Sequence, residues 1–147
     1  MEGLSRRGPS LTVVIDSSTT LAWVLPDEGR TVADAVLDHV TMSGAWAPSL
    51  WPQEVANVLL ASVRRKRITQ AVSDRILLQL GALPIDLDPE TGHHAWGRTY
   101  TLAARHGLTI YDATYLELAQ RLGLPLATLD RDLGAAAVAA GVELFEA

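Results

Sequence analysis

Short apolar runs alternate along the chain with segments of helical periodicity. The runs at residues 11–15 and 125–129 are hydrophobic on both alternating faces, as strands buried between two layers are. Shorter strand candidates lie at 45–49, 84–87 and 142–145, and helical patterns at 18–25, 30–42, 52–65, 69–80, 89–106, 112–122 and 132–140. Strands alternating with helices predict an α/β fold, a three-layer α/β/α sandwich with a central parallel sheet.

The chain has the length of one domain. Its 147 residues can bury a substantial single core, and glycine and proline fall between the predicted elements. The sequence shows no internal repeat and no low-complexity linker. We therefore expect residues 1–10 to form a flexible N-terminal tail and residues 11–147 to form one folded domain.

Four carboxylates are notable because each ends an apolar run or lies in a largely apolar helix. Asp16 and Asp130 follow the strands predicted at 11–15 and 125–129. Glu54 lies in a narrow polar seam of the helix at 52–65, and Asp112 lies on the apolar arc of the helix at 112–122. A carboxylate removed from water needs a proton, a cation or hydrogen bonds.

The helix that begins near Asp112 carries other charges as well. Glu117 and Arg121 fall on the opposite arc, four residues apart, and we expect them to pair with each other in solvent. The helix would then keep its ordinary charges on the outside and Asp112 on the inside.

Helix ends offer an alternative interpretation of these acids. Asp16 and Asp112 could cap the helices that follow them, although serines after Asp16 could do the same. Glu54, near the start of its helix, could be stabilised there by the helix dipole. Both interpretations remain open at this point.

Other polar side chains could assist the four acids. Thr128 shares a side of its strand with Asp130, and Asp132 is expected to cap the last helix, with the reverse assignment of Asp130 and Asp132 still open. Asn57 lies one helical turn after Glu54 on the same side, and Ser17 directly follows the first strand end.

The chemistry of this set favours a hard cation. The carboxyl ends of parallel strands meet at one edge of a sheet, so the acids are expected to converge there. Oxygen ligands without His or Cys select Mg²⁺, or Mn²⁺, rather than zinc. A metal that acidifies water would supply a nucleophile suited to phosphodiesters.

The order of motifs resembles the PIN-domain ribonucleases, in particular the VapC-type toxins of toxin–antitoxin pairs. The matching pieces are VIDSS, PQEVANVL, YDATYLELA and TLDRDL, and they run from Ile15 to the C-terminus. By this resemblance, Asp16, Glu54, Asp112 and Asp130 are the catalytic and metal-binding acids. Thr128 corresponds to a hydroxyl often found beside the last acid, and Asp132 to an occasional fifth one.

The resemblance also implies a function. A chain of this family would be a Mg²⁺-dependent endoribonuclease, residues 11–147 would be a PIN-like nuclease domain, and the partners would be RNA, a cognate antitoxin and a second copy in a homodimer. The alternative is a non-catalytic PIN-like module that binds RNA or a partner protein. In either case we expect a cytoplasmic protein, because no stretch approaches the length needed to span a bilayer.

Charge and composition narrow these choices further. The net charge of −5 argues against a broadly basic nucleic-acid surface, but Arg64, Arg65, Lys66 and Arg67 form a basic run that could contact RNA phosphates. Alternatively, the positive charges of this run could only stabilise the C-terminal end of a helix through the helix dipole. The absence of cysteine excludes disulfides and thiol nucleophiles, and the absence of a glycine-rich loop with lysine excludes P-loop chemistry.

Overall fold

Four short parallel strands form the centre of the computed structural model, which describes residues 12–25 and 30–146. The strands are β1 (Val13–Ile15), β2 (Ala45–Pro48), β3 (Ile85–Asp88) and β4 (Leu126–Ala127), in the order β3-β2-β1-β4. The N-terminal tail expected at residues 1–10 lies outside the described residues. The strand expected at 11–15 is seen as the three residues of β1, all fully buried.

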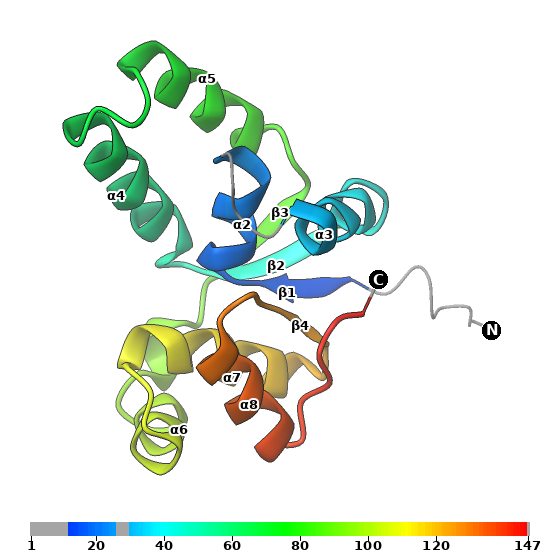
Figure 1. The fold of residues 1–147 in the computed structure, drawn as a ribbon. Coiled ribbons are helices and arrows are strands. Elements are labelled where there is room, and N and C mark those ends of the chain that lie inside the picture. Colours follow the sequence, from blue (N-terminus) through cyan, green and yellow to red (C-terminus); the bar gives the residue numbers. More distant parts are fainter. Residues whose placement is uncertain (1–11, 26–29, 147) are drawn as a thin grey trace.

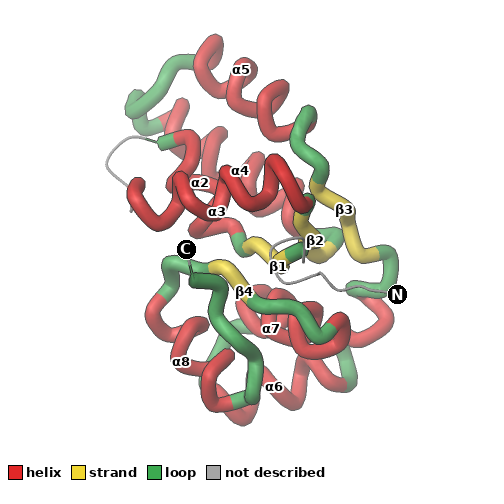
Figure 2. The backbone as a smooth tube through the Cα atoms, turned by 90° about the vertical axis from the view of Figure 1, so that its right-hand side faces the viewer, coloured by secondary structure: helices red, strands yellow, loops and turns green. Residues whose placement is uncertain are grey.

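Helices cover both faces of this sheet (Figure 1). One layer contains α2 (Ser17–Val24), α3 (Arg30–Ser43), α4 (Trp51–Arg64) and α5 (Gln70–Gly81), and the other contains α6 (Arg98–His106), α7 (Ile110–Leu122) and α8 (Arg131–Ala139). The side view in Figure 2 shows the same two layers with the strands between them. The predicted three-layer α/β/α sandwich with a central parallel sheet is confirmed.

Strand register decides which residues emerge together at the edge of the sheet. Val14 pairs with Leu126 and Ile15 pairs with Ala127 between β1 and β4. The next residues along the two strands are Asp16 and Thr128, so parallel pairing delivers a carboxylate and a hydroxyl to the same edge.

Helix α7 is more deeply buried than its sequence suggests. The expectation that Glu117 and Arg121 pair in solvent was wrong: they pair at 2.7 Å, but Glu117 is only 2% exposed. The helix contacts β1, β2 and β4 as well as α6 and α8, so no side of its centre faces water. Arg121 also contacts Asp88 at 2.6 Å, and this guanidinium neutralises two buried acids.

Two predicted elements are shorter than the pattern indicated. The helix expected at 89–106 is interrupted, with a short 3₁₀ turn η2 (Gly92–His94) before α6. The side chain of Thr91 bonds both the backbone oxygen and a carboxylate oxygen of Asp88, which holds this segment in a turn. The strand expected at 142–145 is reduced to one bridge between Leu144 and Leu126. Among the described helices, none has the length and apolar composition needed to cross a membrane.

Candidate functional site

Asp16 is buried at the carboxyl end of β1, with 4% of its surface exposed. Its Oδ1 accepts hydrogen bonds from the Thr19 amide at 3.0 Å and from Ser18 Oγ at 2.8 Å, and its Oδ2 accepts one from Thr128 Oγ1. Burial raises the pKa of Asp16, while these hydrogen bonds act in the opposite direction. Asp16 is therefore the cap of α2, as the alternative interpretation had it, and it also lies beside the end of β4.

Thr128 joins Asp16 to Asp130. Its hydroxyl donates to Asp16 and accepts from the Asp130 amide at 3.0 Å. Ser18 Oγ accepts from the Leu129 amide at 3.0 Å, which fastens the start of α2 to the same loop. Two strand ends that are distant in sequence are thereby held in one hydrogen-bonded unit.

Asp130, rather than Asp132, caps α8. Its Oδ1 accepts a hydrogen bond from the Leu133 amide at 3.1 Å, so the expectation that Asp132 is the cap was wrong and the reverse assignment of the cap holds. Asp132 lies in the first turn of α8 and is exposed. In the described part of the chain, Asp130 Oδ2 has no hydrogen-bond partner and stays available to a ligand.

Glu54 is joined to α7 by Tyr115, a residue on the apolar arc of that helix. Tyr115 is 1% exposed, and its hydroxyl donates to Glu54 Oε1 at 2.6 Å. Burial raises the pKa of Tyr115, and Glu54 raises it further. A buried tyrosine hydroxyl usually has a polar partner, so a lone tyrosine inside the apolar arc was the signal that could have revealed this contact.

Asp112 provides the strongest evidence that the acids form one group. The side chain of Thr109 caps α7 by accepting from the Asp112 amide at 3.0 Å, so Asp112 itself is not the cap. Partial burial raises the pKa of Asp112, and the charges of Asp130, Glu54 and Asp16 raise it further. The charged groups that raise this pKa are three carboxylates, so Asp112 lies in a region of negative potential.

The remaining candidates differ in their relation to this group. Ser17 is half-buried at the start of α2 and lowers the pKa of Tyr115, which places it near the partner of Glu54. Asn57 is exposed on α4 and makes no hydrogen bond with the four acids. The basic run 64–67 is exposed at the turn after α4, where Lys66 has a left-handed backbone with φ 62°. At 1.5 Å per residue, Arg64 lies about 15 Å along the helix from Glu54.

The donor chemistry of this group fits a hard divalent cation. All four acids supply oxygen ligands, and Mg²⁺ is commonly held by one or two carboxylates together with several waters. Within residues 12–25 and 30–146, however, no three acidic or imidazole side chains already form a metal-binding group. Thr128 and Tyr115 instead hold individual acids, Asp16 and Glu54, by hydrogen bonds.

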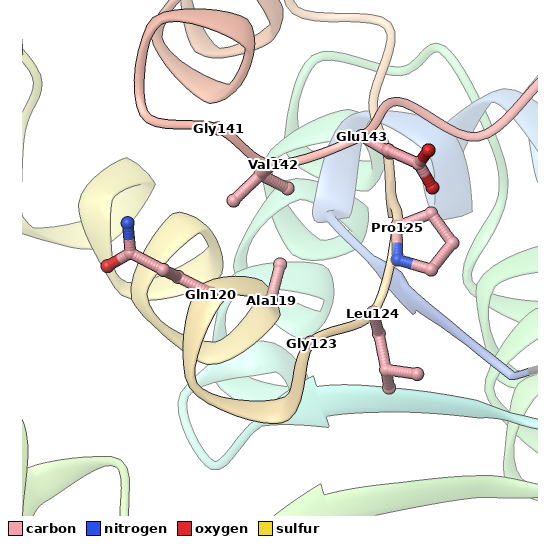
Figure 3. Close-up of a pocket in the computed structure, with 8 residues that line it drawn as sticks. All are labelled: Ala119, Gln120, Gly123, Leu124, Pro125, Gly141, Val142 and Glu143. Atoms are coloured by element: carbon pink, nitrogen blue, oxygen red, sulfur yellow. The ribbon is translucent and has the colours of Figure 1, made fainter.

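A separate pocket of about 250 Å³ lies away from the acids (Figure 3). Its walls come from the end of α7, from Pro125 just before β4, and from residues 141–143. Because Asp130 follows β4 while Pro125 precedes it, the pocket is at the opposite end of the strand from the acids. It is not part of the candidate site.

The fold and the site together define a class: a parallel α/β/α sandwich in which the charges of three carboxylates, Asp130, Glu54 and Asp16, raise the pKa of Asp112. The PIN domain family model matches residues 13–139, and this chain belongs to that family. The chain is 29% identical to Ribonuclease VapC3 of Pyrobaculum aerophilum over 84% of its own length and 92% of that protein. It is 37% identical to Ribonuclease VapC1 of Mycobacterium tuberculosis over 61% of its length and 65% of that protein.

A solved structure supports the fold. The crystal structure of VapC20 of Mycobacterium tuberculosis, described as a sarcin-ricin loop cleaving toxin, superimposes with a TM-score of 0.65 at 14% identity. The match covers 92% of this chain and 100% of VapC20. At that identity the likeness concerns the architecture, which is the three-layer sandwich described above.

Proposed function

We propose that this protein is a divalent-metal-dependent endoribonuclease of the VapC type, with Mg²⁺ as its ion and Mn²⁺ as a substitute. The main support is the raised pKa of Asp112, caused by burial and by three neighbouring carboxylates. Such a concentration of negative charge is costly without a cation, and membership of the PIN domain family makes a nuclease the natural use for it.

Asp16, Asp112 and Asp130 would hold the ion, and Glu54 would complete the group or orient the attacking water. When bound, the ion would acidify water and offset the charge that develops on the phosphate. Thr128 would keep Asp16 and Asp130 at a fixed separation, and Tyr115 would fix the direction of Glu54. Glu54 could then accept a proton from the water molecule while the oxygen of that water attacks phosphorus.

The bond that breaks would be the one between phosphorus and the 3′ oxygen of the preceding ribose. Water supplies the new oxygen on phosphorus, and the departing 3′ oxygen takes up a proton. The products would carry a 5′-phosphate and a 3′-hydroxyl. The basic run of Arg64, Arg65, Lys66 and Arg67 begins about 15 Å along α4 from Glu54 and would contact RNA phosphates away from the cut.

The partners proposed for this chain follow from its relatives. The proteins it matches in sequence are ribonucleases named VapC, and we propose the same biological setting here: a cytoplasmic toxin, inhibited by a cognate antitoxin and active as a homodimer. The antitoxin would have to cover the acidic rim or compete with RNA for the basic turn.

One observation favours the alternative of a binding module. In the described residues the acids are held by protein hydrogen bonds and do not form a finished coordination group. A protein that only binds RNA would need no metal-binding group, and it would bind RNA without cleaving it.

Incubation of a labelled RNA pool with the purified protein separates the two functions. We expect shortening of the RNA in Mg²⁺, none in EDTA, and none with Asp16→Asn. Asp86→Asn is the matched control, because Asp86 is an exposed acid on β3. A titration with Mg²⁺ and Mn²⁺ should accompany the assay, and intact RNA at every metal concentration with every pool would contradict the nuclease.

A further inference from the structure

A groove of about 420 Å³ runs along α8, the helix that Asp130 caps. One wall is the C-terminal end of α6 and the residue after it, and the other is the outer face of α8. The groove is lined by His106, Gly107, Asp132, Ala135, Ala136 and Ala139. Its volume is within the range of roughly 300–1,000 Å³ that is usual for small-ligand sites.

Both walls of the groove continue into the candidate active site. Asp132 lies two residues after Asp130 in the first turn of α8. On the other wall, Gly107 is followed within two residues by Thr109, whose side chain holds the amide of Asp112. A nucleotide whose phosphate lay at the acids could therefore place its base in the groove.

The lining matches a planar group better than a charged one. Three alanines on α8 and Gly107 have little or no side chain, so the lining combines small residues with two polar side chains, His106 and Asp132. Asp132 would repel a phosphate, so the groove does not suit the RNA backbone. His106 can donate at least one N–H, and a carboxylate only accepts hydrogen bonds.

We propose that this groove is a base-binding subsite for the nucleotide next to the cut, and that it prefers bases with an exocyclic amino group. The inference rests on the proposed ribonuclease function and adds a substrate preference to it. The amino group of cytosine, adenine or guanine would donate to Asp132, while His106 would donate to a ring nitrogen or carbonyl oxygen. Uracil lacks the amino group, and its one donor on this edge, N3–H, lies between two carbonyl oxygens that the Asp132 carboxylate would repel.

The first test does not depend on cleavage. Cytidine and uridine differ in hydrogen bonding at positions 3 and 4, and each can be titrated into the protein while the ring protons of His106 are followed by NMR. We expect both nucleosides to shift these signals, with cytidine binding about fivefold or more tightly, as expected for one added hydrogen bond to a charged acceptor. Equal affinities, or no shift with either nucleoside, would overturn the proposal.

Two variants connect the preference to the groove. Asp132→Asn offers a donor as well as an acceptor, so the cytidine preference should fall towards unity. Ala135→Leu fills the groove at an exposed helix position and should weaken cytidine binding about tenfold or more. Ala71→Leu is its control, because Ala71 is an exposed alanine on α5, and it should bind as the wild type does.

Cut-site mapping then separates this inference from the nuclease proposal. On an RNA pool with random sequence, the wild type should cut next to amino-bearing bases more often than next to uracil, and Asp132→Asn should reduce this bias. Cutting without any base bias would overturn the subsite and leave the nuclease intact. A change in oligomeric state on Ala135→Leu, with cytidine binding unchanged, would instead identify the groove as a contact between copies and also overturn the proposal.

Discussion

The hydroxyl of Tyr115 donates a hydrogen bond of 2.6 Å to Glu54 Oε1. Tyr115 belongs to α7 and Glu54 to α4, so this contact joins the two helical layers beyond the ends of the strands (Figure 1). Glu54 is placed in the first turn of α4, and a glutamate side chain at such a position can adopt several directions. The hydrogen bond gives it one direction, towards Tyr115 on α7.

Tyr115→Phe tests whether this orientation matters for cleavage. The substitution keeps the buried ring and removes only the hydroxyl, so the free energy of unfolding should fall by only about 1–2 kcal/mol. We expect kcat to fall by about tenfold to a hundredfold with little change in KM, because a displaced catalytic group lowers the rate of the chemical step. Steady-state cleavage of an RNA oligonucleotide measures both constants.

The control for this variant is Tyr100→Phe, on an exposed tyrosine of α6. It should leave kcat, KM and stability unchanged. A second check is the double variant with Glu54→Gln: if Tyr115 acts through Glu54, removing both should cost no more than removing Glu54 alone. Additive losses would show that Tyr115 has a separate role.

Asp112→Asn should make the metal-free protein more stable. Burial and neighbouring carboxylates raise the pKa of Asp112 in the folded state, so folding favours its protonated form. The destabilisation caused by ionised Asp112 is absent below the unfolded pKa, grows as pH rises towards the folded pKa and is complete above the folded pKa. The stability gained from Asn should therefore be complete near neutral pH. A melting temperature in EDTA at pH 7 should rise by about 2 °C or more.

The same pair of proteins reports on metal binding. Added Mg²⁺ should raise the melting temperature of the wild type, because an ion that binds only the folded state stabilises it. The rise should be smaller in Asp112→Asn, which has lost a charged ligand. Equal rises in the two proteins would remove Asp112 from the metal site.

Arg121→Met should destabilise the fold by about 3 kcal/mol near neutral pH. It leaves Asp88 and Glu117, which are 3% and 2% exposed, without their shared guanidinium. Chemical denaturation measures the loss, and Arg105→Met on the exposed face of α6 is the control. A loss no larger than that of the control would show that the two acids have another source of compensation.

The pH dependence of this loss has a definite sign. Burial raises the pKa of Asp88, but hydrogen bonds from Arg121, the Glu90 amide and Thr91 outweigh it, and the pKa is lowered overall. A lowered pKa contributes stability above the unfolded pKa of about 4, and that stability is lost as pH falls through the folded pKa. The difference between wild type and Arg121→Met should therefore shrink on acidification below about pH 4.

The sequence predicted the strands better than it predicted the contacts that hold the acids. The run Val13–Ile15 is buried on both faces, so its position and the location of Asp16 after it follow from hydrophobicity alone. The link between Glu54 and Tyr115 joins residues 61 positions apart, and no local pattern encodes it. Glu117 was misplaced because a charge in a helix suggests solvent, whereas here α6, α8 and the sheet enclose the helix and Arg121 supplies the counter-charge.

The basic turn after α4 should contribute to RNA affinity through charge alone. Arg64, Arg65 and Arg67 are exposed, and none forms an ion pair with another described residue. Replacing all three with Gln should weaken binding of single-stranded RNA and reduce the slope of log K against log salt by about 0.7 for each phosphate that the protein no longer neutralises.

Binding is best measured in the Asp16→Asn background, where the RNA is not cut. Arg75→Gln, on the exposed surface of α5, is the matched control. An unchanged salt slope in the triple variant would mean that the basic run does not contact RNA and only stabilises the C-terminal end of α4 through the helix dipole.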